Sequence, residues 1–170
     1  MVNHPSEDYI TQIARFDPSK GLFDVLSGYS MFHDRMQEAQ LNIKVPKLVI
    51  YGHRSIDDPD ATRTYEAVVN QIEENMPHLR DHICVVRAKP SNQVLNAVLS
   101  KAKIVLQLSA CEGFEIKVES GFLIEPHDPY NVAQRLLEVH TDEATAVGHS
   151  CLYLVKKLVE KLVEKKAWKS

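Results

Sequence analysis

Segments with the pattern of β-strands alternate with segments of helical periodicity along this chain. The strand candidates, short runs rich in β-branched and other apolar residues, are Tyr9 to Ala14, Lys47 to Tyr51, Ile83 to Arg87, Ile104 to Leu108 and Phe122 to Ile124. The helix candidates are Leu22 to Gln37, Ala61 to Asn75, Gln93 to Lys101, Phe114 to Glu119, Pro129 to His140 and a long last segment from about Thr145. This alternation predicts an α/β fold of Rossmann-like type, a parallel sheet with crossover helices.

The last segment has the pattern of an amphipathic helix. Its apolar stripe consists of Cys151, Leu154, Val155, Leu158, Val159, Leu162 and Val163, and lysines and glutamates lie opposite. We therefore predict a Rossmann-like domain over residues 1-150 and a helical tail over residues 151-170 that packs on the same domain. The stripe beyond Leu158 is expected to be partly exposed and to support weak homo-oligomer formation, in preference to membrane-surface binding.

The composition is that of an ordinary globular protein and argues against several partners. Of the 170 residues, 44% are hydrophobic and 25% charged, and the net charge of −3 gives no nucleic-acid footprint. No apolar stretch is long enough for a membrane span, and the amino-terminal residues lack a leader pattern, so a cytoplasmic location is expected. The three cysteines, Cys84, Cys111 and Cys151, have no metal-ligand spacing, and we expect neither a metal nor a cofactor.

Two cations flank the turn that follows the first predicted strand. Arg15 and Lys20 lie on either side of Asp17-Pro18-Ser19, between that strand and the next predicted helix. Ligands of open α/β sheets bind at the carboxyl ends of strands, and helix amino termini favour anions, so this pair is a candidate phosphate site. Taken alone, the two residues fit better as ordinary solvated charges beside a turn.

Five segments, taken together, resemble those of a known protein family. They are YITQIARFDPSKG at residues 9–21, LVIYGH at 48–53, DDPD at 57–60, VLQLS at 105–109 and EGFEIKV at 112–118. In this order they resemble the carboxyl-terminal lobe of retaining glycosyltransferases with two Rossmann-like domains, the GT-B type. Within that type the chain is most similar to the fungal trehalose phosphorylase and trehalose synthase group, from about Tyr9 to Leu154.

The resemblance implies a reaction and a set of site residues. The reaction is retaining glucosyl transfer between trehalose and phosphate or a nucleotide diphosphate, so the implied partners are phosphate, a sugar phosphate or a nucleotide sugar. Arg15 and Lys20 would neutralise the phosphate, and Glu112 would be the catalytic residue that orients the glucose. Backbone amides at Gly113, Phe114 and Glu115 would face the donor phosphate, and Gly52 and His53 would form a ligand loop. Without the resemblance, Glu112 fits a helix-capping acid and His53 a structural loop residue.

The chain departs from the family pattern after residue 118. The family places a second glutamate eight positions after the first, whereas Glu119 follows Glu112 by seven, a rotation of roughly 100° on a helix. From Val118 the chain passes almost directly to Ser120-Gly121-Phe122, and the intervening strand and glycine-rich donor loop are missing. A second contraction is expected between Glu143 and Ala146. We therefore expect an incomplete donor site and a chain that is inactive alone, or else a non-catalytic remnant that binds phosphate, sugar or another protein.

Overall fold

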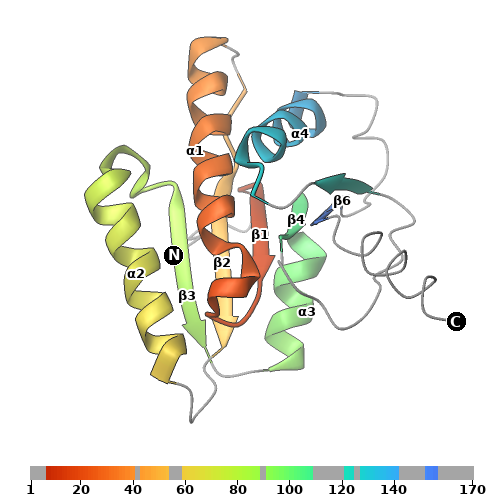
Figure 1. Ribbon diagram of the computed structural model, residues 1–170. Helices are drawn as coiled ribbons and strands as arrows, with labels where there is room; N and C mark the ends of the chain where they lie inside the picture. The colour runs from red at the N-terminus through yellow and green to blue at the C-terminus, as the bar shows by residue number, and fades with distance from the viewer. Residues whose placement is uncertain are drawn as a thin grey trace, which may run out of the picture.

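The computed structural model describes residues 7–40, 43–53, 59–88, 91–108, 121–124, 127–141 and 152–156. In chain order they form β1 (Tyr9–Ile13), α1 (Leu22–Glu38), β2 (Lys47–His53), α2 (Pro59–Asn75), β3 (Ile83–Ala88), α3 (Asn92–Lys101), β4 (Ile104–Gln107), β5 (Gly121–Ile124), α4 (Pro129–Thr141) and β6 (Leu152–Lys156). Two short 3-10 helices, η1 (Pro18–Lys20) and η2 (Pro77–Leu79), complete the described elements (Figure 1). The α/β, Rossmann-like fold class is confirmed.

The described strands form one parallel sheet in the order β3-β2-β1-β4-β6-β5. The chain builds β2 and β3 on one side of β1 and then crosses to the other side for β4. Gln12 of β1 is accordingly in register with Ile50 of β2 and Leu106 of β4. In open α/β sheets, ligands bind outside the carboxyl ends of the strands at such a change of direction, which here lies between β1 and β4. In Figure 1 this edge of β1 to β3 is the lower one, where α1 also begins.

Helices cover both faces of this sheet. The larger core joins Ile10, Leu48 and Leu106 to the apolar sides of α1, α2 and α4, and these three strand residues are at most 1% exposed. Side chains alternate along a strand, so the neighbouring Tyr9 points the other way, where its hydroxyl donates to the Val98 carbonyl of α3 at 2.6 Å. Burial on both faces explains why the strands have nearly continuous apolar sequences.

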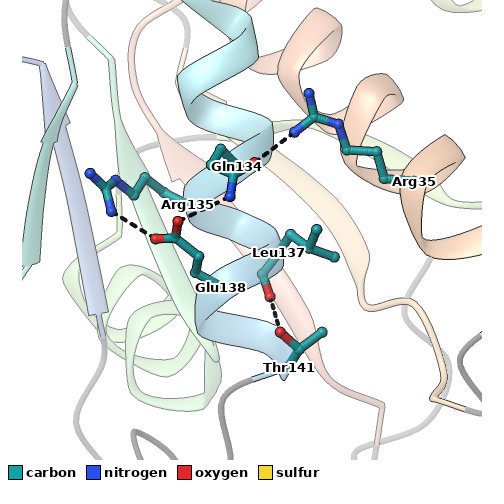
Figure 2. A network of polar contacts seen from close by, with 6 residues as sticks. All are labelled: Arg35, Gln134, Arg135, Leu137, Glu138 and Thr141. Carbon is teal, nitrogen blue, oxygen red and sulfur yellow. Dashed lines mark hydrogen bonds and ion pairs between the residues drawn. The ribbon is translucent and has the colours of Figure 1, made fainter. Parts of the chain in front are cut away.

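Helices α1 and α4 pack closely. A Cβ at Gly28 of α1 would lie 2.6 Å from the nearest methyl group of Val132, so glycine is what lets the two helices approach at this point. Figure 2 shows the polar contacts beside the packed surface: Arg35 donates to Gln134 at 3.3 Å, and Gln134 donates to Glu138 at 3.1 Å. The contacts fix α4 along α1, the helix whose first turn lies at the switch point.

The structure corrects the prediction for the tail. Leu152–Lys156, expected in a helix, form β6 between β4 and β5. The helical prediction is wrong there because a short, continuous apolar run fits a buried strand as well as a helix, and a place between two strands pairs its backbone on both sides. The remaining tail residues, 151 and 157–170, lie outside the described residues, as does the predicted helix Phe114 to Glu119. The expected self-association through the tail stays a prediction. Among the helices of the described ranges, none is long and apolar enough to cross a bilayer.

Candidate phosphate site at the carboxyl edge

The loop after β1 is anchored by Phe16. This side chain is 1% exposed and meets the ring of Tyr65 from α2 edge-on, with the ring centroids 5.1 Å apart. It also fills the space above Gly52 of β2, where a Cβ would lie 2.4 Å from the Phe16 ring. The anchored Phe16 separates two charged neighbours, the exposed Arg15 and the partly buried Asp17.

Asp17 begins η1 and lies within electrostatic reach of both cations. Its Oδ1 accepts hydrogen bonds from the Ser19 amide at 2.8 Å and the Ser19 hydroxyl at 2.6 Å, as an N-cap residue does. These two hydrogen bonds are the main reason why the pKa of Asp17 is lowered, and the charges of Arg15 and Lys20 lower it further. Because both cations act on one carboxylate, they belong to one local cluster, whose formal charge at neutral pH is +1.

Gly21 joins η1 to α1 and brings the loop against β4. Its φ of +64° lies in the left-handed region, and a Cβ there would stand 1.9 Å from the carbonyl oxygen of Leu108. Gly21 is also the N-cap of α1 and offers no side chain to the amides of its first turn. Those amides and the helix dipole favour an anion. The loop after β1 therefore meets Leu108, the residue that follows β4, at the switch point, beside the cationic side chains and the start of α1.

Beneath this loop lies Gln12, which the sequence analysis did not single out. Its side chain is 1% exposed, and its Nε2 donates to the backbone carbonyl of Lys20 at 2.6 Å. A signal for it exists in the sequence, because Gln12 is a long polar residue between Ile10 and Ile13 in a segment predicted to be a buried strand. An amide at such a place must have a hydrogen-bond partner, which indicates a tertiary role.

The structure brings together some of the predicted site residues and leaves others outside the described ranges. Arg15 and Lys20 share the loop after β1. Gly52 and His53 end the adjacent strand β2, where His53 is in register with Ala88 of β3, and Gly52 contacts Phe16 instead of being open to a ligand. Glu112, Gly113, Phe114 and Glu115 lie outside the described residues, shortly after Leu108 in the chain. Their roles remain predictions. Within the described ranges no cluster of three or more His, Cys, Asp or Glu is arranged to hold a metal ion.

Comparison with curated proteins gives relatives that act on trehalose. The chain is 37% identical over 164 residues to trehalose phosphorylase of Grifola frondosa, a match that covers 82% of this chain and 22% of the relative. It is 31% identical over 115 residues to trehalose synthase of Thermococcus litoralis, covering 67% of this chain and 25% of the relative. The chain thus spans about a quarter or less of these relatives. No protein-family model matches it.

Solved structures give the same fold at low identity. A UDP-forming α,α-trehalose-phosphate synthase from Burkholderia xenovorans, in complex with glucose-6-phosphate, has a TM-score of 0.65 and 12% identity, covering 83% of this chain and 38% of that one. An E. coli structure described as trehalose-6-phosphate bound with UDP-2-fluoro glucose has a TM-score of 0.63 and 14% identity. The match covers 84% of this chain and 38% of that one. At these identities the likeness establishes the fold.

Fold and relatives together define the class: the chain is a glycosyltransferase-family domain with the Rossmann-like architecture of GT-B enzymes. Within that class it is related to trehalose phosphorylase and trehalose synthase.

The charge of Asp17 leads to a prediction for anion affinity. Asp17→Asn keeps an oxygen acceptor for the Ser19 amide but removes the negative charge beside Arg15 and Lys20. We expect phosphate to bind about fivefold more tightly, on the order of 1 kcal/mol for one unit charge near the surface. A phosphate titration followed by amide NMR shifts measures the change. Asp81→Asn, which precedes β3 at the opposite edge of the sheet, is the control, and an equal gain there would show that net charge alone is responsible.

Proposed function

We propose that this domain binds the phosphate group of a sugar phosphate or nucleotide sugar at the switch point between β1 and β4. Arg15 and Lys20 supply the positive charge, and the first-turn amides of α1 donate to the phosphate oxygens. The observation that supports this most directly is that both cations lie in the connection between β1 and α1, on either side of Asp17, with the uncapped first turn of α1 directly after them. An anion at this place would meet a guanidinium, an ammonium and a helix dipole together.

The second part of the proposal concerns the reaction. As part of a larger assembly, the domain would serve retaining glucosyl transfer between trehalose and phosphate or a nucleotide diphosphate, with Glu112 orienting the glucose. The chain spans only 22% to 25% of the curated relatives it matches, so a whole active site of their kind has to draw on residues beyond this segment. Correct placement of both reactants supplies about 7–11 kcal/mol of the barrier reduction in such reactions. We therefore propose that this chain binds but does not turn over substrate alone.

The anion site is tested by titrating the chain with phosphate and with glucose 1-phosphate. We expect weak, saturable shifts at the amides of Lys20, Gly21 and Leu22, because charge-assisted hydrogen bonds contribute about 1.5–3 kcal/mol each. Arg15→Ala should weaken binding about tenfold or more. Arg80→Ala is the matched control, since Arg80 pairs with Glu73 at 3.0 Å near the opposite edge of the sheet. Flat shifts in the wild-type chain, or unchanged affinity in Arg15→Ala, would contradict the site.

The catalytic part is tested separately by mixing the chain with trehalose and phosphate and measuring glucose 1-phosphate. No product is expected. Turnover that is lost in Glu112→Gln would overturn the proposal of inactivity and would show that a complete catalytic site lies within this chain.

A further inference from the structure

Gln12 is placed in β1 where packing alone favours an apolar side chain. The strand residues in register with it, Ile50 and Leu106, are apolar and 1% exposed, and Gln12 itself is equally buried. A buried amide lowers stability relative to a hydrocarbon of the same shape unless its polar atoms are paired. Only half of this amide is paired: Oε1 has no hydrogen-bond partner among the described residues. Core packing therefore does not account for glutamine at this position.

The paired half of the amide holds one backbone atom of the proposed anion loop. Nε2 donates to the carbonyl of Lys20 at 2.6 Å. The amide has one workable orientation, because a flipped side chain would set Oε1 against the carbonyl oxygen, and neither atom can donate. Lys20 is the last residue of η1, and Gly21 follows with its positive φ and its close approach to the carbonyl of Leu108. The backbone at Lys20 and Gly21 is thus fixed by β1 on one side and by the end of β4 on the other.

This juxtaposition gives Gln12 a role that rests on the proposed phosphate site. We propose that Gln12 is a positioning residue for anion binding. By holding the Lys20 carbonyl, it directs the Lys20 side chain and the first-turn amides of α1 toward the same anion. It acts through the loop backbone and does not touch the anion. A binding site whose donors are already fixed loses less entropy when the ligand arrives, so a lost tether reduces affinity without removing any ligand contact.

Two substitutions separate this role from simple core packing. Gln12→Met keeps the length of the side chain and is neutral, but it cannot donate to the Lys20 carbonyl. Gln12→Glu regains a donor only when its carboxyl group is protonated, and burial favours that neutral form. The effect of an added negative charge away from the site is measured with Gln71→Glu, which makes the same chemical change on α2, where Gln71 accepts from Asn75 at 3.0 Å.

Sulfate is the probe for the pH series, because it keeps its double negative charge across the range used. Its dissociation constant is measured by amide NMR shifts for each variant and divided by the wild-type value at the same pH. At about pH 5.5 we expect Gln12→Met to bind about tenfold more weakly and Gln12→Glu to be within about twofold of wild type. At about pH 8.5 Gln12→Glu should lose affinity as well. Gln71→Glu should match the wild type at both values.

The comparison at low pH is the decisive one, because both Gln12 variants are then neutral and differ in the hydrogen-bond donor. Urea unfolding is recorded in parallel. We expect Gln12→Met to be as stable as wild type or more so, which separates lost affinity from lost folding. If wild-type protein binds sulfate and Gln12→Met binds it equally well, the positioning role is wrong while the phosphate site stands. If Gln12→Glu at low pH binds as weakly as Gln12→Met, the role is likewise wrong. Absence of binding by the wild-type chain contradicts the phosphate site and with it this inference.

Discussion

Gly21→Ala should lower the free energy of unfolding by about 2–5 kcal/mol. A left-handed backbone costs a non-glycine residue about 1–2 kcal/mol, and overpacking adds roughly 1–3 kcal/mol. The crowded atom is the carbonyl oxygen of Leu108, 1.9 Å from the hypothetical Cβ, and a backbone oxygen cannot rotate away as a side chain can. Urea unfolding at neutral pH measures the loss, which is a large fraction of the stability of a typical domain.

Gly28→Ala provides the control for this result. A Cβ there would also be crowded, by Cγ1 of Val132 at 2.6 Å and Cβ of Val132 at 2.7 Å, but the backbone at Gly28 is helical, so no left-handed conformation contributes. We expect an added Val132→Ala substitution, which removes Cγ1 but keeps Cβ, to restore only part of the stability lost in Gly28→Ala, because α1 and α4 must still move apart. Gly21→Asn, in contrast, should remain destabilised, because asparagine tolerates a positive φ but keeps the Cβ. Full stability of Gly21→Asn would show that the backbone angle, and not the contact with Leu108, makes glycine necessary.

Stability should also fall steeply as the pH drops below about 6.5, because two histidines are buried in the neutral form. His140, at the end of α4, is 8% exposed; its Nε2 lies 3.1 Å from the Lys44 carbonyl and its Nδ1 lies 3.1 Å from Lys103 Nζ. These contacts fit a ring that donates from Nε2 and accepts at Nδ1. Burial lowers the pKa of His140, and the charge of Lys103 lowers it further.

His33 of α1 is the second such group. It is 7% exposed, and neither of its ring nitrogens has a hydrogen-bond partner among the described residues. Burial lowers its pKa, with a further contribution from His82, whose ring centroid is 4.8 Å away, and a smaller one from His78 at 6.3 Å. Asp34 acts in the opposite direction, with its carboxylate 3.8 Å from Nδ1 of His33. Protonation of His33 therefore places a positive charge in a buried position between α1, η2 and the start of β3.

The direction in which pH changes the stability follows from these lowered pKa values. The unfolded chain takes up a proton at each histidine near pH 6.5, before the folded chain does, so acid favours unfolding in the interval between the two pKa values. Each histidine contributes a slope of up to about 1.4 kcal/mol per pH unit there. The lowered pKa values of Asp17, Glu7 and Glu138 act only at lower pH, below about 4.5, so the two windows are separable.

The measurement is a series of urea unfolding curves from about pH 7.5 to pH 5. His140→Gln, which retains a donor and an acceptor, should reduce the slope over this interval. His127→Gln is the control, because the His127 side chain is 76% exposed, with its Nδ1 3.3 Å from the Asp24 carboxylate. A slope that is the same in wild type and His140→Gln would contradict the assignment of acid sensitivity to His140.

Local sequence patterns were sufficient for the central part of this fold. The runs that became β1 to β4 are rich in β-branched residues and are separated by amphipathic segments, and Asp128 caps α4, its carboxylate accepting from the Asn131 amide at 2.9 Å. Residues 152–156 were predicted wrongly, because their strand conformation depends on β4 and β5 and not on local periodicity.

The site was predictable to the same extent. The turn chemistry of Asp17 placed Arg15 and Lys20 between a strand and a helix, and the structure confirms that placement. The contact of Gly21 with Leu108 and the hydrogen bond from Gln12 were not predictable, because each depends on a distance that exists only after the sheet has formed. Local patterns therefore identify the charged residues, whereas the groups that position them become visible only in the fold.

The contact of Gly21 with Leu108 also determines when, during folding, the proposed anion site is completed. The turn that contains Arg15, Asp17 and Lys20 is synthesised early and can form from local contacts. The Leu108 carbonyl, against which Gly21 packs, is placed only when the later strand β4 pairs with β1. Contacts between distant parts of a chain form late because closing the intervening loop costs entropy. A nascent chain that ends before Leu108 therefore has both cations of the proposed site but lacks the backbone contact that fixes their loop. Anion binding at this site would thus indicate that β4 has joined the sheet.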